Sequence, residues 1–375
     1  MSQRIAIIEN HIIATNSIRY ALTKMLVDKG YEVRVFTTGS EQEIELARSR
    51  GFSITDIGSS NKNPLEVWRY IRNLRTQLKA FQPHLCLTFT IRPAIWGNLV
   101  TGKLKIPTIT NITGTGPLFA SSHPVYRVAR MLYKFVLRKT AFIFFQNDED
   151  MNLFLSHGFV SKDRAGRIPG SGVDPVHYSP QPYPDKKDGL QFLFIGRLVK
   201  DKGILEFVEA ARKLKPAHPQ LHFQVLGPVW LQNLKENIIT VDEIARWEQE
   251  GLIQYLGETT DVRPFIAQCN CIVLPSYREG TSNVLLEAAS MERPGITCDT
   301  TGCREIVEDG RTGFLCRVAD ADDLAGKILR MATLSEEARR NMGGAARTKV
   351  VKEFHKQIVL DAYIQQIQRL TTRQR

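Results

Sequence analysis

Two glutamates, Glu279 and Glu287, stand eight positions apart in the stretch REGTSNVLLEAAS at residues 278–290. In one continuous helix, eight steps of about 100° would leave their carboxylates roughly 80° apart and two turns distant along the axis. They could not then act together on one small group. The residues between them predict a helix start instead, because a glycine and good N-cap residues precede an apolar helical run. These residues are Gly280, Thr281, Ser282 and Asn283.

A helix start at this position would suit a phosphate group. The first N–H groups of a helix lie at the positive end of its dipole, and Gly280 lets a ligand approach the backbone. Glu287 would lie one turn inside the helix among apolar neighbours, where a carboxylate needs hydrogen-bond donors such as a ribose diol. The alternative is two unrelated surface glutamates. We favour one extended ligand with Glu279 and Glu287 at its opposite ends.

A second group of residues predicts the same chemistry. FIGRLVKDKG, residues 194–203, is a strand that ends at Gly196 and is followed by Arg197, Lys202 and Gly203 at the entrance to a helix. Two cations at the carboxyl end of a strand can neutralise a diphosphate, arginine through its planar fork and lysine as a point charge. Together with the helix start they predict a nucleotide site that uses no metal and no other cofactor.

Apolar runs that alternate with amphipathic helical patterns must position these residues, and this alternation is typical of βαβ units with parallel sheets. Two such series occur on either side of a proline-rich stretch, PVHYSPQPYPDKKDG, which we interpret as a linker. The strands expected in the first series are 4–10, 31–38, 52–58, 84–90, 107–113 and 141–147. Those expected in the second are 190–196, 221–227, 252–257, 270–276, 294–299 and 312–318.

The predicted fold is therefore α/β, with two Rossmann-like, doubly wound domains that face each other across a cleft. The first domain takes residues 1–180 and the second residues 181–355. The last segment, 356–375, is expected to be a helix that packs back toward the first domain. The helical pattern before it is interrupted by Gly343 and Gly344.

The composition agrees with two globular domains, because 375 residues exceed one ordinary core and the hydrophobic fraction is 43%. No run of about 18 apolar residues predicts a membrane span, and the N-terminal residues do not resemble a signal peptide. We therefore expect a cytoplasmic protein. The six cysteines have no CxxC spacing and predict reduced core residues.

The formal charge of +11 is concentrated in the first half of the chain. From Lys62 to Lys139 there are 13 basic residues and one acidic residue, Glu66. Within this stretch, VYRVARMLYKFVLRK (125–139) interleaves cations with apolar residues, as in a helix that lies on an anionic bilayer. The alternatives are a helix packed on the sheet with its charges in water, and attraction to nucleic acid.

Four segments in this order resemble the retaining family 4 glycosyltransferases of the GT-B fold. They are IPGSGVDPVHYSP (168–180), GRL followed by Lys202 and Gly203, the E-x(7)-E pair, and GCREIVEDGRTGFL (302–315). The resemblance is strong over the second domain and extends, through the 168–180 segment before the linker, to the whole architecture. It implies transfer of a sugar from a nucleotide donor with retention of anomeric configuration and without a divalent metal.

The resemblance also implies roles for individual residues. In the family, the arginine and lysine that match Arg197 and Lys202 hold the donor diphosphate. The glutamate that matches Glu287 binds the ribose, and the one that matches Glu279, with the backbone after it, contacts the donor sugar. We therefore expect Arg197, Lys202 and Glu279 to be catalytic. The expected donor-binding residues are Gly196, Gly280, Thr281, Ser282, Asn283 and Glu287.

The first domain departs from the commoner family pattern, because it lacks a glycine-rich loop after its first strand and a histidine after a middle strand. The stretches TFTIRP, NITGTGPLF (111–119), FFQND and GSGVD instead resemble a subgroup that extends polyprenyl-diphosphate-linked sugars in bacterial surface polysaccharide or glycan assembly. This subgroup implies a UDP-sugar donor carrying a hexose or N-acetylhexosamine. It also implies a lipid-linked saccharide acceptor and a peripheral position on the cytoplasmic face of the inner membrane. The acceptor-side candidates are Asn16, Arg19, Arg92 and Thr113.

Two other functions compete with this interpretation. A basic nucleic-acid-binding protein would explain the charge, but no stacking platform, helix-turn-helix or zinc motif accompanies it. A GT-B-shaped epimerase or hydrolase would need carboxylates and histidines that converge for acid–base work, and neither glutamate has a histidine near it in sequence. The acidic triplets 148–150 and 320–322 each begin an expected helix, so we interpret them as capping residues and expect no metal site.

Overall fold

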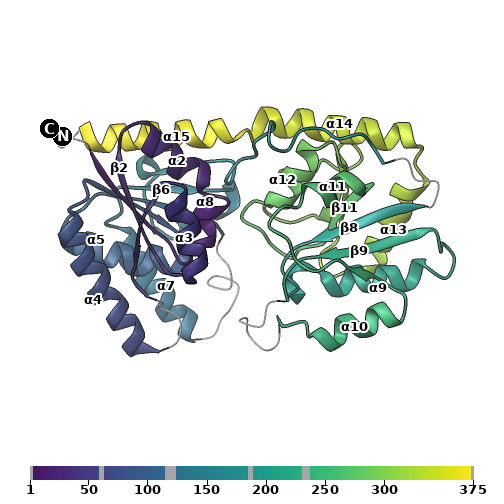
Figure 1. The fold of residues 1–375 in the computed structure, drawn as a ribbon, viewed down its shortest axis with the longest axis horizontal. Coiled ribbons are helices and arrows are strands. Elements are labelled where there is room, and N and C mark those ends of the chain that lie inside the picture. The colour runs from purple at the N-terminus through teal and green to yellow at the C-terminus, as the bar shows by residue number, and fades with distance from the viewer. Residues whose placement is uncertain (1–2, 59–62, 115–123, 185–188, 230–236, 373–375) are drawn as a thin grey trace. The chain divides into compact units, whose positions relative to one another are not determined.

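The computed structural model describes residues 3–58, 63–114, 124–184, 189–229 and 237–372. The chain forms two compact units, which Figure 1 shows. Unit 1 contains residues 1–171 and 357–375, and unit 2 contains residues 172–356. The chain thus passes between the units twice, whereas the sequence-based boundaries stand at 180/181 and 355/356. Residues 115–119 of NITGTGPLF and residues 185–188 of the expected linker lie outside the described residues.

Unit 1 contains a parallel seven-stranded sheet in the order β3-β2-β1-β4-β5-β6-β7. Its strands are β1 (Arg4–Ile8), β2 (Glu32–Thr37), β3 (Ser53–Asp56), β4 (Leu85–Phe89), β5 (Thr108–Ile112), β6 (Phe142–Phe145) and β7 (Ala165–Arg167). Six of these fall within the expected strands, and β7 was not predicted. The helices are α1 (Ile13–Asn16), α2 (Tyr20–Asp28), α3 (Glu41–Ser49), α4 (Pro64–Phe81), the π-helix η1 (Pro93–Gly97), α5 (Asn98–Leu104), α7 (Pro124–Leu137), α8 (Asp148–Ser156) and α15 (Lys356–Thr372).

Helices cover both faces of this sheet. Successive residues of a strand point to opposite sides, so each face carries apolar side chains that a helix layer buries. Ile5 and Ile7 of β1 pack into a core shared with α2, α3 and α15. Ala6 and Ile8 pack into a core shared with α4 and α5. Figure 1 shows α4, α5 and α7 on one side of the strands and α2 and α15 on the other. The C-terminal helix α15 is held by Tyr363, whose hydroxyl accepts a hydrogen bond from Asn111 Nδ2 at 2.8 Å.

Unit 2 contains a parallel six-stranded sheet in the order β10-β9-β8-β11-β12-β13. Its strands are β8 (Leu190–Ile195), β9 (Leu221–Leu226), β10 (Gln254–Tyr255), β11 (Cys271–Leu274), β12 (Gly295–Cys298) and β13 (Gly313–Cys316). Its helices are the 3-10 turn η3 (Lys200–Lys202), α9 (Ile204–Leu214), α10 (Val241–Gln249), α11 (Arg263–Gln268), α12 (Asn283–Ser290), α13 (Ala321–Thr333) and α14 (Glu336–Glu353). All six strands had been predicted. The prediction of two Rossmann-like domains with parallel sheets is therefore confirmed.

The expected interruption at Gly343 and Gly344 is wrong, because α14 continues through both residues. A Cβ at Gly343 would lie 2.1 Å from the carbonyl oxygen of Glu292, so this glycine permits a close approach of the helix to a neighbouring turn. The prediction for the cysteines is confirmed, because all six are free and buried. Within the described residues, no helix has both the length and the apolar composition needed to cross a bilayer.

Each sheet reverses its strand order at one point, and ligands of such folds bind beyond the carboxyl ends of the strands at that point. In unit 1 the reversal lies between β1 and β4, and in unit 2 between β8 and β11. The loops that follow these four strands therefore form the two places where a site is expected.

Candidate active site

Three loops meet beyond the carboxyl ends of neighbouring strands in unit 2. They follow β8, β11 and β12, which are adjacent in the sheet. The β8–α9 loop carries Gly196, Arg197 and Lys202, and the β11–α12 loop carries Glu279 and the helix-start residues. Because the reversal of strand order lies between β8 and β11, the tertiary structure brings both sequence-predicted groups to the expected ligand position of this sheet.

The first contact between these loops is an ion pair. Lys202 Nζ donates to Glu279 Oε1, and the two side chains are 18% and 14% exposed. The residue after Lys202 makes this approach possible. Gly203 has a φ of +77°, and a Cβ there would lie 2.1 Å from the carbonyl oxygen of Pro275 in the β11–α12 loop. Arg197 is exposed on the same β8–α9 loop, next to a half-buried Gly196.

The β12 loop fixes the backbone around Glu279. The Glu279 N–H donates to the Thr301 carbonyl at 3.1 Å, and the Ser282 N–H donates to the Gly302 carbonyl at 3.0 Å. Gly302 has a φ of +80°, and a Cβ on it would lie 2.5 Å from the Glu279 carbonyl oxygen. Its own N–H donates to Glu305 Oε2 at 2.8 Å. The segment GCRE at residues 302–305 therefore positions the Glu279 backbone.

The start of α12 follows directly. Ser282 is the N-cap, and its hydroxyl accepts a hydrogen bond from the Leu285 N–H at 3.4 Å. Gly280 and Thr281 precede the cap and are partly exposed, and Asn283 is the first residue of the helix. With Lys202 beside the loop, the N-terminal end of α12 combines a positive helix dipole with a fixed cation. This arrangement is suited to a phosphate group.

Glu287 lies one turn further along α12, partly buried. Burial raises the pKa of its carboxyl to about 7, although a hydrogen bond to Tyr178 and the charge of Lys356 oppose this rise. The loss of water around a carboxylate disfavours its charged form unless a ligand supplies donors. Glu287 therefore has the environment of a group that binds hydroxyls, with its neighbours Tyr178 and Lys356 also in unit 2.

Two residues that support this site were not predicted. Tyr178 contacts Glu287 from the segment that had been interpreted only as linker. Tyr277 precedes the Glu279 loop, and its hydroxyl donates to Glu206 Oε1 on α9 at 2.7 Å. Tyr277 could have been found in the sequence SYREG (276–280), because a tyrosine hydroxyl next to a buried strand needs a hydrogen-bond partner when it is withdrawn from water. Tyr178 carried no comparable signal in the sequence.

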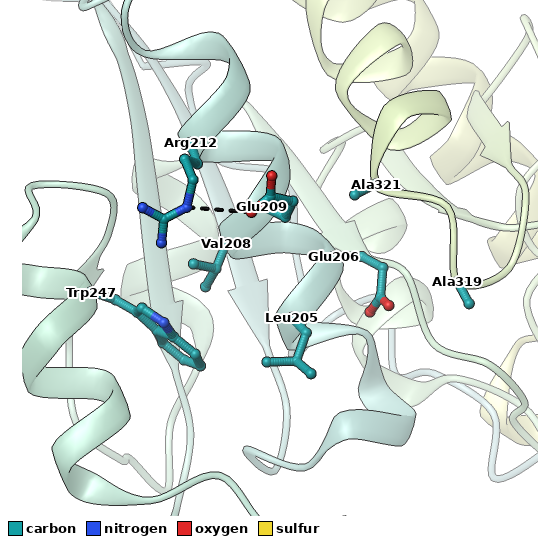
Figure 2. Close-up of a pocket in the computed structure, with 8 residues that line it drawn as sticks. All are labelled: Leu205, Glu206, Val208, Glu209, Arg212, Trp247, Ala319 and Ala321. Atoms are coloured by element: carbon teal, nitrogen blue, oxygen red, sulfur yellow. Dashed lines mark ion pairs between the residues drawn. The ribbon is translucent and has the colours of Figure 1, made fainter.

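A hollow of about 340 Å³ lies on the other side of Glu206, between α9, α10 and the segment before α13. Figure 2 shows Glu206 at one end of it and the ion pair between Arg212 and Glu209 at the other. Its wall also includes Trp247. The hollow contains neither Lys202 nor Glu279, so we do not assign the donor site to it.

In unit 1 the reversal of strand order is occupied by a buried ion pair. Glu9 follows β1 and is 2% exposed, and its Oε2 accepts a hydrogen bond from Arg19 Nη1 at 3.2 Å. The Arg19 guanidinium also lies 4.2 Å from the ring centre of Phe89 at the end of β4. Burial raises the pKa of the Glu9 carboxyl, and Arg19 and Thr15 offset part of this rise. Arg19 is thus an interior residue that is 6% exposed.

The other acceptor-side candidates follow β1, β4 and β5. Asn16 ends α1, its Nδ2 donates to the Glu43 carbonyl at 2.8 Å, and its Oδ1 is buried without a partner. Arg92 is exposed after β4 at the start of η1, and Thr113 is half-buried one residue after β5. The four candidates therefore lie in the segments that follow β1, β4 and β5, at or beside the reversal point, and Arg92 is the exposed one among them.

The acidic triplets cap helices, as the sequence analysis had predicted. Asp148, Glu149 and Asp150 form the first turn of α8, and Asp320 is the N-cap of α13. Within the described residues, no cluster of three or more histidine, cysteine, aspartate or glutamate side chains could hold a metal ion.

Two family models match most of the chain. "Glycosyl transferase 4-like domain" matches residues 16–170, and "Glycosyl transferases group 1" matches residues 189–333. The first match lies in unit 1 and the second in unit 2. The residues of this candidate site in unit 2 all fall within the second match, apart from Tyr178 and Lys356.

Individual proteins also resemble this chain. It is 30% identical over 166 residues to the capsular polysaccharide biosynthesis glycosyltransferase CapM of Staphylococcus aureus, a match that spans 42% of that protein and 44% of this chain. It is 24% identical over 371 residues to the N,N'-diacetylbacillosaminyl-diphospho-undecaprenol alpha-1,3-N-acetylgalactosaminyltransferase of Campylobacter jejuni, which spans 92% of this chain and 93% of that enzyme. Among solved structures, Anabaena HepE in complex with UDP and glucose has a TM-score of 0.79 at 14% identity, covering 97% of this chain and 99% of that one.

Proposed function

Because the chain belongs to the group 1 glycosyltransferases with a glycosyl transferase 4-like N-terminal domain, we propose that it transfers a sugar from a nucleotide-sugar to a saccharide acceptor. We further propose that the donor is a UDP-sugar that carries a hexose or N-acetylhexosamine. The acceptor we propose is a glycan linked to a polyprenyl diphosphate, in the assembly of a bacterial surface polysaccharide or glycan.

The observation that carries this proposal is the meeting of Lys202, Glu279 and the N-terminal end of α12 at the reversal of strand order in unit 2. A nucleotide-sugar would lie along these residues, with its diphosphate at Lys202, Arg197 and the helix start. Its sugar would then contact Glu279, and its ribose would contact Glu287. The two glutamates thus bind opposite ends of one donor and do not act on one small group.

The same residues would assist the chemical step. When the bond between the sugar and the diphosphate breaks, negative charge develops on the leaving diphosphate. Fixed cations and helix N–H groups stabilise such charge without reorganising during the reaction, and removal of one such contact reduces kcat about 10²–10³-fold. We propose that Arg197 and Lys202 perform this role without a metal and that the product retains the anomeric configuration of the donor.

The acceptor side is proposed for unit 1. Arg92, Asn16 and Thr113 surround the carboxyl ends of β1, β4 and β5, where an acceptor of a doubly wound domain would bind. Arg19 would act through Glu9, because its guanidinium is buried in that ion pair. The similarity to an enzyme named for an undecaprenol-linked substrate supports a lipid-linked acceptor and a peripheral position on the cytoplasmic face of the inner membrane.

The experiment that tests the donor is a calorimetric titration of the protein with UDP-, GDP- and ADP-sugars in the presence of a chelator. We expect binding of a UDP-sugar, and NMR of the transfer product should show the donor's anomeric configuration. Preference for a GDP- or ADP-sugar would correct the nucleotide alone. Arg197→Ala and Lys202→Ala should each strongly reduce turnover, and full activity of both variants would contradict the site.

A further inference from the structure

One face of unit 1 carries a large excess of positive charge. The helices α4, α5 and α7 contain eight basic residues and one acidic residue. The helices on the opposite face, α2, α3 and α15, contain four basic and five acidic residues. Charges kept only for solubility would be spread evenly over the unit, whereas the basic residues of the 62–139 stretch are not. The tertiary structure gathers them on one side of the sheet.

The three helices form one continuous layer. Both α4 and α7 pack against α5 and against η1, and Figure 1 shows them on the same side of the strands. The neighbouring α8 carries three acidic residues in its first turn. Asp150 is buried, Asp148 pairs with Arg167 at 2.8 Å, and Glu149 is exposed. These acids therefore offset only part of the positive charge, because the three helices of the layer carry eight basic residues.

Exposed apolar side chains lie on the outer side of this basic layer. On α7, Tyr133 and Val136 face the core, but Val128, Met131 and Phe135 are 60%, 63% and 56% exposed. Residues three and seven positions apart share one face of a helix, so these three form a single stripe. An ordinary surface helix would carry polar residues on this side.

Helix α4 repeats the same pattern. Its buried side includes Tyr70 and Leu74, whereas Leu65 and Trp68 are 54% and 55% exposed. The guanidinium of Arg72 lies 5.4 Å from the centre of the Trp68 ring. A tryptophan beside an arginine on an exposed apolar stripe is typical of a helix that lies at a bilayer interface, where the ring is half in lipid and the cation meets headgroups.

We propose that the outer face of α4, α5 and α7 is the surface by which the protein docks on an anionic lipid bilayer. The apolar stripes Leu65–Trp68 and Val128–Met131–Phe135 would enter the boundary between headgroups and acyl chains. The surrounding cations, among them Arg69, Arg75, Arg127, Arg138 and Lys139, would bind anionic headgroups. Charge complementarity selects this partner over a neutral one, and the apolar stripes select a bilayer over a nucleic-acid backbone, which has no apolar layer to receive them.

The proposed docking surface rests on the proposed function in one respect: the lipid-linked acceptor is the reason why the protein would bind a membrane. Binding to vesicles can be measured without donor or acceptor, and transfer can be measured with a short-chain acceptor in solution. Failure of the docking surface and failure of the proposed transfer are therefore distinguishable.

The test is flotation of the full chain with vesicles of phosphatidylglycerol and phosphatidylcholine in equal parts, compared with vesicles of phosphatidylcholine alone. We expect binding to the anionic vesicles that is lost at about 1 M salt, where the screening length falls to about 3 Å. The triple variant Val128→Ser, Met131→Ser, Phe135→Ser should reduce binding at least tenfold. The matched control Val27→Ser, Leu46→Ser changes exposed apolar residues of α2 and α3 on the opposite face and should bind normally.

The contribution of the cations has its own variant. Replacing Arg127, Arg138 and Lys139 by alanine should weaken binding about fivefold for each cation, because each basic residue near an anionic surface contributes about that factor. Replacement of Lys24, Arg48 and Arg369 on the opposite face removes the same charge and should have a much smaller effect. The replaced side chains lie at the surface, so we expect these variants to have the unfolding temperature of the wild type. Thermal unfolding of each variant therefore verifies that it is folded.

Trp68 reports insertion directly. Its emission should shift to the blue on anionic vesicles and be quenched by brominated lipid, and Trp68→Phe should abolish both signals. Equal binding to neutral vesicles, or normal binding of the stripe variant, would overturn the proposal. Loss of binding to a DNA duplex in the cation variant, with no binding of the wild type to vesicles, would assign this face to nucleic acid instead.

Discussion

Replacement of Lys202 by alanine separates the two roles that the structure gives this residue. Its ammonium pairs with Glu279 at a place where the two side chains are 18% and 14% exposed. Exposed ion pairs contribute about 0–1 kcal/mol, whereas removal of one partner from a fully buried pair costs about 3–5 kcal/mol. For this partly buried pair we expect Lys202→Ala to lower the free energy of unfolding of unit 2 by about 2 kcal/mol.

The effect on activity should be larger than the effect on stability. A donor diphosphate would lose one of its fixed cations, so kcat should fall about 10²–10³-fold, which corresponds to about 3–4 kcal/mol of barrier. Scanning calorimetry should show a lower unfolding temperature, by about 4–8 °C for a domain of this size. Initial rates measured at a temperature where the variant is fully folded give kcat without interference from unfolding.

A double variant distinguishes the two effects. Lys202→Ala combined with Glu279→Gln removes both charges, so most of the lost stability should return because no uncompensated carboxylate remains. The activity should stay low, since neither the cation for the diphosphate nor the carboxylate for the sugar is present. Between the single and the double variant, stability would then recover while activity stays low.

The matched control is another lysine of the same region. Lys213 on α9 pairs with Asp322, and these side chains are 38% and 79% exposed. Lys213→Ala should therefore cost less than about 1 kcal/mol and leave kcat unchanged. Normal kcat of Lys202→Ala, or recovery of activity together with stability in the double variant, would contradict both roles of Lys202.

Further outcomes follow from three residues of the same site. Burial raises the pKa of Glu287 to about 7, so the ionised form that accepts from a ribose is present above this value. The Kd of an intact nucleotide-sugar, titrated calorimetrically, should fall about tenfold between about pH 6 and about pH 8, and Glu287→Gln should bind weakly without this dependence. The neutral form is favoured in the folded protein, so the contribution of Glu287 to stability, followed by thermal unfolding, should decrease as the pH rises from about 4.5 to about 7 and be absent in Glu287→Gln. Gly302→Ala places a Cβ 2.5 Å from a carbonyl oxygen of the β11–α12 loop, whereas Gly310→Ala has a similar φ of +75° in open space; donor affinity should fall in the first variant only. Tyr277→Phe removes a hydrogen bond of 2.7 Å to α9 and should lower the unfolding free energy in a denaturant titration by about 1–2 kcal/mol, and an unchanged value would exclude a positioning role.

The α/β class follows from the sequence alone, because burial on both faces makes parallel strands apolar throughout and their connecting helices amphipathic. The sequence also indicates a helix start among Thr281, Ser282 and Asn283, because short polar side chains before an apolar helical run are good N-caps, and the structure places the cap at Ser282. Local interactions within a few residues encode both features. The β7 strand, three residues long at a sheet edge, carries too short a pattern to be recognised.

Features that depend on contacts between distant residues could not be predicted. Nothing near Lys202 shows that its ammonium meets Glu279, which is 77 positions away. The burial of Arg19 could not be predicted either, because a basic residue in a loop is ordinarily exposed. The fold places its guanidinium between Glu9 and Phe89.

The number of basic residues in the first half of the chain is known from the sequence, but the face on which they lie is not. The sequence fixes how many basic residues lie between 62 and 139, but periodicity within each helix does not say which face of the sheet that helix covers. That choice follows from the direction in which each strand-to-strand connection crosses the sheet. The common face of α4, α5 and α7, and the candidate site shared by loops distant in sequence, therefore become visible only in the folded chain, because both result from the order of the strands.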